Sequence, residues 1–246
     1  MSKNVIFMIN IVQDERSKNQ GYEFSINSWK RYAETNSCEL FVLNQHIDSE
    51  YMKPQWIKMY ILDILDSNNI DYDQVLYVDS DTIIKPDAPN IFDLSENKFC
   101  AVANYGDYDW VLRSIENYSK ELFDNYSFPY YKYFNSGVLL FNKTHKEFFK
   151  QIQNFYESNH SKILWMQKNY GVGNDQPVFN FFVNKYLYED FKLLGYEWNM
   201  QDLNRSELIG DDLLFTKYGY IYHFNCGIKP NPGVWLEKTY NKLYIK

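Results

Sequence analysis

The sequence has few cysteines, no excess of positive charge and no long apolar run. Its three cysteines, Cys38, Cys100 and Cys226, are too few and too widely spaced for a disulfide framework or a CxxC zinc motif. The formal net charge is −7, whereas a surface that attracts the phosphates of nucleic acid is normally basic. No window approaches the ~20 apolar residues that span a bilayer. These features argue against a nucleic-acid partner and leave only peripheral contact with a membrane.

The N-terminal segment "NVIFMINIV" (4–12) has the apolar character of a signal peptide but not its layout. The run is short, is interrupted by Asn10, and is followed by no small-residue cleavage site, so it predicts a first β-strand. The widely spaced cysteines predict reduced thiols, as in a cytoplasmic protein. We therefore expect a cytoplasmic location.

Apolar segments with two different periodicities alternate along the chain. Apolar residues make up 45% of the 246 positions, enough for a large core. Short β-branched runs predict strands at 4–12, 38–45, 74–78, 98–107 and 136–143. Helical spacing predicts helices at 22–36, 54–69, 144–159 and 174–186. Without a linker or repeat, this pattern predicts one α/β domain with a mostly parallel sheet, whose ligands bind beyond the carboxyl ends of the strands.

The pattern Asp-x-Asp occurs three times, and only one copy follows an apolar strand. Asp71-Tyr72-Asp73 precedes its strand and Asp107-Tyr108-Asp109 follows a glycine, so both copies are interpreted as solvated loops. Asp79-Ser80-Asp81 comes directly after "VLYV". In extended chain, residues i and i+2 point to the same side, so the carboxylates of Asp79 and Asp81 should project together. Two such charges repel, and a divalent cation between them resolves the repulsion.

Three enzyme chemistries use paired aspartates at the end of a strand. They are metal-held transfer from a nucleotide sugar, phosphoryl transfer through an aspartyl phosphate, and nucleotidyl transfer. The last of these would need a Gly-rich phosphate loop after the first strand, and "NIVQDERSKNQG" (10–21) is not one. The rest of the chain has to decide between the other two.

Four segments in a fixed order resemble the signature blocks of glycosyltransferase family 8, the glycogenin-like and bacterial galactosyltransferase-like enzymes. They are "YDQVLYVDSDTII" (72–84), "YFNSGVLLFNK" (133–143), "GNDQPVFN" (173–180) and "HFNCGIKP" (223–230). The resemblance implies a single GT-A domain over 1–246, with the nucleotide bound by about residues 1–105 and the acceptor by the remainder. It implies transfer of a hexose from a UDP-sugar to a glycan or another hydroxyl acceptor, with retention of configuration. Bacterial and viral glycan assembly are both settings for such an enzyme.

The resemblance also implies a metal site. In the family, residues that match Asp79, Asp81 and His223 bind Mn²⁺ or Mg²⁺, which grips the diphosphate of the donor. Two carboxylates and one imidazole are suitable ligands for manganese. Taken alone, His223 would more often be a hydrogen-bonded core histidine.

Further residues are implied on the donor side. Lys229 would place a positive charge on the diphosphate, although Asn231 stands where the family usually has Trp after the Lys-Pro pair. Asn10 and Ile11, at the end of the first strand, should lie near the nucleotide by the strand-end rule. Lys58 resembles a family lysine near the donor but also fits a solvated helix face. Ser80, between the two aspartates, is included in the donor site.

The donor sugar itself is expected beside two blocks. Asn135, Ser136 and Gly137 match the segment that touches the sugar, and a glycine permits close approach of the backbone. Asp175 and Gln176 match the pair beside the anomeric carbon, where a carboxylate can stabilise an oxocarbenium-like transition state. Asp175 also fits a helix N-cap with a structural role only.

Two alternatives of different classes stay open. A phosphatase of the haloacid dehalogenase type would use Asp79 as a nucleophile, although that nucleophile usually lies on the first strand and a β-α-β unit precedes it here. A sugar-binding protein without turnover would retain the fold but not the reaction. Several aromatic side chains are interpreted as core rather than as sugar-stacking platforms: Trp110, Tyr130, Tyr131, Tyr133 and Trp198.

Overall fold

A computed structural model describes residues 3–11, 21–45, 47, 52–203, 212–225, 228 and 230–245. Its central sheet has six strands in the order β2-β1-β3-β6-β5-β7. These strands are β1 Asn4–Ile9, β2 Glu39–Leu43, β3 Gln74–Asp79, β5 Phe99–Ala103, β6 Phe134–Asn142 and β7 Phe191–Leu194. Pairs β1–β2, β1–β3 and β5–β7 are parallel, while β6 runs antiparallel to both of its neighbours. The expected α/β class with a mostly parallel sheet is confirmed.

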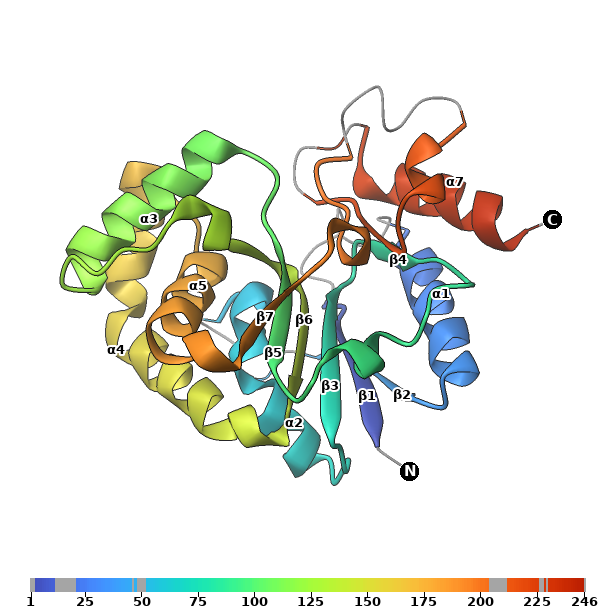
Figure 1. The fold of residues 1–246 in the computed structure, drawn as a ribbon, viewed down its shortest axis with the longest axis horizontal. Coiled ribbons are helices and arrows are strands. Elements are labelled where there is room, and N and C mark those ends of the chain that lie inside the picture. Colours follow the sequence, from blue (N-terminus) through green and yellow to red (C-terminus); the bar gives the residue numbers. More distant parts are fainter. Residues whose placement is uncertain are drawn as a thin grey trace.

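Alternating residues of the strands supply two hydrophobic layers, as period-two geometry requires. Val5 and Phe7 of β1 belong to the core under α2, α4 and α5, and Ile6 and Met8 belong to the core under α1. Both faces of the sheet are therefore covered by helices, with α3, α4 and α5 on one side and α1 on the other (Figure 1). The helices are α1 Tyr22–Thr35, α2 Ile61–Ser67, α3 Tyr108–Leu122, α4 Lys146–Tyr170, α5 Asp175–Tyr186 and α7 Pro232–Tyr244.

A small second sheet joins two distant parts of the chain. Strand β4, Thr82–Ile84, follows the β3 turn and pairs antiparallel with β8, Ile221–His223, with Thr82 opposite His223. The indole N–H of Trp29 on α1 donates to Thr82 Oγ1 at 2.9 Å, and Thr82 Oγ1 donates to the carbonyl of Asp79 at 2.7 Å. These bonds fix the turn that carries the paired aspartates.

Several predicted boundaries differ from the structure. The strand predicted to end at 107 ends at Ala103, and the third Asp-x-Asp copy begins α3 instead of lying in a loop. There the carboxylate of Asp107 accepts from the backbone N–H of Trp110, a side-chain N-cap. The helix predicted at 144–159 continues to Tyr170, where Gly171 in the left-handed region ends it. The first residues of 54–69 form a 3₁₀ helix, Pro54–Tyr60, ahead of α2.

The C-terminal helix α7 was not predicted, because the surrounding stretch is rich in proline and glycine. Asn231 caps it by accepting from the backbone N–H of Val234 at 3.1 Å, and Pro232 occupies its first turn, a favourable position for proline. Within the described ranges, no helix has both the length and the apolar character needed to cross a membrane.

Candidate functional site

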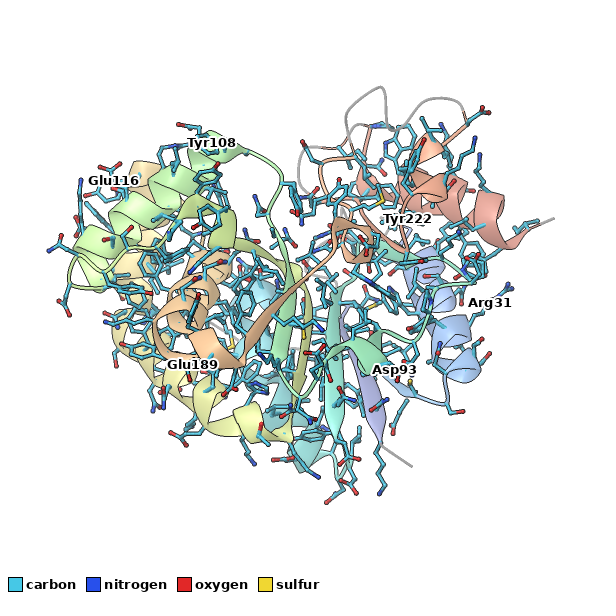
Figure 2. The ribbon with its side chains drawn as sticks, in the orientation of Figure 1. Arg31, Asp93, Tyr108, Glu116, Glu189 and Tyr222 are labelled. Atoms are coloured by element: carbon cyan, nitrogen blue, oxygen red, sulfur yellow. The ribbon has the colours of Figure 1, made fainter. Side chains whose placement is uncertain are left out.

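The paired aspartates lie where β3 ends and β4 begins. Asp79 is the last residue of β3, and Ser80 and Asp81 form the turn into β4. Pairing of β4 with β8 then brings His223 to this turn: its Nε2 lies 3.1 Å from Asp81 Oδ1 and 3.7 Å from Asp79 Oδ2. Tyr222, the neighbour of His223, is labelled in Figure 2 on the C-terminal side of the molecule, across from Tyr108 at the start of α3.

The charges of this cluster support one another. Burial alone would favour neutral Asp81, but the positive charge and hydrogen bond of His223 outweigh it and lower the pKa of Asp81. Burial likewise opposes a charged His223, and the carboxylates of Asp81 and Asp79 outweigh it and raise the pKa of His223. The cluster therefore favours a positive charge, either a proton or a cation, at His223 Nε2.

The carboxylate and imidazole atoms of this cluster are suitable ligands for a divalent cation. One ligand atom from each of Asp79, Asp81 and His223 can be chosen so that all lie within 4.8 Å of one another. The side chains of Asp79 and Asp81 are 28% and 23% exposed, which leaves the cluster open on one side, while His223 is 3% exposed. Two carboxylate oxygens and one imidazole nitrogen suit Mn²⁺ and are compatible with Mg²⁺.

Gly137 on β6 makes room for this cluster. A Cβ at this position would lie 2.3 Å from His223 Cε1 and 2.7 Å from Asp79 Oδ2. Both distances are far below ordinary contact, so only glycine allows the strand to approach the cluster this closely. The structure thus brings together the "FNSG" block and the metal-site residues.

Lys58 is buried rather than on a solvated helix face, so that alternative is wrong. Its Nζ lies 3.0 Å from Asp175 Oδ2 and 3.3 Å from Asp79 Oδ1, and 3.3 Å from both oxygens of Ser136. Burial would lower the pKa of Lys58, but the two carboxylates outweigh burial and raise it. Tyr77 also contacts the group, since its hydroxyl donates to Asp79 Oδ1.

The two residues predicted as catalytic open α5, and both are buried. The N-cap is Asn174, whose side chain accepts from the N–H of Asp175 at 2.7 Å, so the alternative that Asp175 is the cap is wrong. Asp175 Oδ2 accepts from Ser136 Oγ at 3.0 Å, and Gln176 Oε1 accepts from the N–H of Ser136 at 3.0 Å. The blocks at 133–143 and 173–180 are therefore in direct contact.

The structure gives fewer contacts for the remaining residues predicted from the sequence. Ile9 is the register partner of Asp79, so Asn10 and Ile11 continue beyond the same edge of the sheet. Lys229 lies outside the described residues. Among the aromatic residues, Tyr133 and Trp198 are buried as predicted, but Tyr130 and Tyr131 are 49% and 61% exposed, so the prediction of core is wrong for these two.

Tyr77 was not predicted as a site residue, and neither was Asn199. Asn199, which has no exposed surface, follows the short 3₁₀ helix Tyr196–Trp198. Its Oδ1 lies 3.1 Å from His223 Nδ1, and its Nδ2 donates to Asn135 Oδ1 at 3.0 Å. The only sequence signal is a polar residue in the otherwise apolar "WNM", which is too weak to assign a role.

Comparison with known proteins gives one family. The sequence model described as "Glycosyl transferase family 8" matches residues 6–238. No curated protein matches the chain significantly.

Three solved structures show the fold to which the chain is similar. A glycosyltransferase involved in the glycosylation of the major capsid of PBCV-1 has a TM-score of 0.59 at 12% identity, covering 96% of this chain and 98% of that one. The galactosyltransferase LgtC, in complex with donor and acceptor sugar analogs, has a TM-score of 0.54 at 15% identity, with 99% and 97% covered. Mouse xyloside xylosyltransferase 1 has a TM-score of 0.50 at 12% identity, with 92% and 99% covered. At these identities the likeness establishes the fold, which is the expected GT-A fold.

Proposed function

The chain belongs to glycosyl transferase family 8 and is a glycosyltransferase, and from this premise we propose that it transfers a hexose from a UDP-sugar to a glycan or another hydroxyl acceptor, with retention of configuration. We further propose one GT-A domain over 1–246, in which about residues 1–105 bind the nucleotide and 106–246 bind the acceptor. No described contact favours the haloacid dehalogenase-type alternative, in which Asp79 would be a nucleophile.

The observation that carries the proposal is the cluster of Asp79, Asp81 and His223 at the carboxyl end of β3. These residues would hold Mn²⁺ or Mg²⁺. When bound, the cation supplies positive charge that stabilises the UDP leaving group. Lys229 stays a prediction as a second cation at the diphosphate, and Asn10 and Ile11 stay predictions at the nucleotide.

The chain's own residues would orient the sugar on the other side of the cluster. Ser136 is held by Gln176 and Asp175 through two hydrogen bonds of 3.0 Å, so this wall of the site is already formed without a ligand. A preorganised carboxylate stabilises developing positive charge better than one that must reorient. We assign Asp175 to the hydroxyls and the anomeric carbon of the donor, and Asn135, Ser136 and Gly137 to the sugar.

Lys58 has a distinct task in the ligand-free protein. Without a positive charge between them, the carboxylates of Asp79 and Asp175 would lie near each other in a poorly solvated site, which is costly. The ammonium group bridges them and so keeps both sides of the site in place for the donor.

The decisive experiment follows UDP release from a panel of nucleotide sugars with Mn²⁺, with and without EDTA. We expect release from at least one UDP-sugar and its loss with EDTA. Turnover of a generic phosphomonoester but of no nucleotide sugar would contradict the proposal. Sugar binding that is independent of both Mn²⁺ and UDP would instead favour a binding protein.

A pair of matched variants tests the metal site. Asp81→Asn removes one charge from the cluster, and we expect it to abolish Mn²⁺-dependent UDP binding, measured by calorimetry, without unfolding the protein. Asp109→Asn changes a different Asp-x-Asp copy, whose carboxylate is 77% exposed and paired with Arg113, and should bind UDP as the wild type does. Equal affinity of the two variants would remove Asp81 from the site.

A further inference from the structure

A relay of buried hydrogen bonds, formed by Gly137, Asn135 and Asn199, leads from the backbone of β6 to the imidazole of His223. The N–H of Gly137 donates to Asn135 Oδ1 at 2.8 Å, and Asn199 Nδ2 donates to the same oxygen at 3.0 Å. The other end of the Asn199 amide, Oδ1, lies 3.1 Å from His223 Nδ1. Asn135, Asn199 and His223 are each at most 7% exposed, so water does not substitute freely for these partners.

The backbone N–H of Gly137 fixes which atoms donate and which accept in this relay. A backbone N–H can only donate, so Asn135 must turn its oxygen toward Gly137. That oxygen then faces the Asn199 amide, which must present its NH₂ group. Reversing either amide would bring two buried donors or two buried acceptors together, and a buried polar group without a partner is strongly disfavoured. Asn199 therefore presents its oxygen to His223, and that oxygen requires a proton on Nδ1.

The backbone holds Asn199 against His223 independently of the side chains. The N–H of Met200 donates to the carbonyl of Ile221 at 2.8 Å, and the N–H of His223 donates to the carbonyl of Met200 at 2.9 Å. The segment that carries Asn199 is thus joined to β8 on both sides of the contact. The backbone position of Asn199 therefore does not depend on the contact that its side chain makes with His223.

From these contacts we infer that Asn199 is a positioning residue that keeps a proton on Nδ1 of His223 by accepting from it, so that Nε2 is the nitrogen that faces Asp79 and Asp81 and exchanges its own proton for a cation. Without Asn199, the imidazole would be expected to prefer the opposite tautomer, because Nε2–H could then donate to Asp81 Oδ1, 3.1 Å away. That tautomer has no lone pair for a cation at Nε2. The relay from Gly137 would keep the proton on Nδ1, so that Nε2 can bind a cation in place of its hydrogen bond to Asp81.

This inference rests on the proposed metal site, but its readout is the protonation of His223 and not activity. The chain has four histidines, so ¹⁵N NMR of the imidazole nitrogens is tractable, and a His223→Asn variant assigns the resonance. Spectra at about pH 7 of the metal-free protein, and of the protein with UDP and Mg²⁺ as a diamagnetic substitute for Mn²⁺, show which imidazole nitrogen keeps its proton. We expect Nδ1 to be protonated in both, and Nε2 to lose its proton only when the cation binds. An unprotonated Nδ1 would overturn the inference, and this readout needs no Asn199 variant to fold.

Variants separate positioning from a merely structural role. Asn199→Leu removes the acceptor, and we expect His223 to switch to the Nε2–H tautomer and Mn²⁺ affinity in the presence of UDP to fall about 10- to 100-fold, as for other residues that orient metal ligands. Asn199→Asp keeps an acceptor for Nδ1–H and should retain the wild-type tautomer and recover most of the affinity. Unchanged tautomer and affinity in Asn199→Leu would refute the relay.

A control variant accounts for the loss of a buried amide as such. Asn142→Leu removes a side chain that is 5% exposed at the far end of β6 and donates to the carbonyl of Asn97. It should lower stability but leave the His223 tautomer and Mn²⁺ affinity unchanged. If the wild type shows the Nδ1–H tautomer but binds no Mn²⁺ with UDP, the proposed function fails while the relay stands.

Discussion

Replacement of Lys58 by methionine tests the electrostatic design of the site. The side chain of Lys58 is 5% exposed, and its Nζ lies 3.0 Å from Asp175 Oδ2 and 3.3 Å from Asp79 Oδ1. Burial opposes its charge, but the two carboxylates outweigh burial and raise the pKa of Lys58. A group whose pKa is raised by folding contributes stability below its unfolded pKa and loses it as the pH rises through the folded value. Near pH 7 the contribution is therefore fully present.

The size of the effect follows from what the substitution leaves behind. Removing one partner of a buried ion pair costs about 3–5 kcal/mol, because the remaining charge stays buried. Asp175 is 7% exposed and would lose its cation, whereas Asp79 is 28% exposed and partly solvated. Ser136 Oγ would still donate to Asp175. We therefore expect a loss near the lower end of the range, about 3 kcal/mol.

Urea unfolding of the metal-free protein near pH 7 measures this loss. A double-mutant cycle with Asp175→Asn isolates the pair, and a coupling of about 1–3 kcal/mol is expected for charged groups in contact. The control is Lys146→Met, which breaks an ion pair with Asp66 whose side chains are 55% and 41% exposed. Exposed pairs of this kind contribute less than about 1 kcal/mol. Equal losses in Lys58→Met and Lys146→Met, or a cycle with no coupling, would refute the reasoning.

Two further predictions concern Gly137 and His145. Gly137→Ala would place a Cβ 2.3 Å from His223 Cε1, so Mn²⁺-dependent UDP binding should fall about tenfold or more; calorimetry should show no loss for Gly106→Ala, whose nearest added contact is 3.7 Å. The second prediction concerns His145. Burial lowers its pKa, and the hydrogen bond to the Asn142 backbone opposes this effect without cancelling it. Unfolding therefore takes up a proton at acid pH, and the free energy of unfolding falls as the pH drops below ~6.5. His145→Gln should reduce this fall by at most about 1.4 kcal/mol per pH unit. Urea unfolding at about pH 7 and about pH 5 measures it. If the variant loses as much stability between the two pH values as the wild type, His145 is not the source.

The sequence predicted the class of the fold because periodicity is a local property. Apolar residues at alternating or helical spacing were enough to locate every strand of the main sheet except β7, the shortest, and the helices α1, α2, α4 and α5. The two helices that were missed, α3 and α7, each begin at a side-chain cap. Asp107 and Asn231 each accept from a backbone N–H and begin α3 and α7. Helix α3 does have apolar residues at helical spacing, Val111, Ile115 and Tyr118, and the prediction missed this pattern.

For the candidate site, too, local sequence identified some residues and the tertiary structure was needed for their contacts. The sequence by itself singled out Asp79 and Asp81, because two carboxylates after an apolar strand need a partner wherever the chain goes next. The family resemblance implied His223 as one partner, but only the tertiary structure shows the contacts. Pairing of β4 with β8 brings His223 to Asp81, packing buries Lys58 between Asp79 and Asp175, and the segment beside β8 delivers Asn199 to His223. These contacts join residues far apart in the chain, so no local pattern shows their geometry, and they form only when the strands have paired and the helices have packed on them.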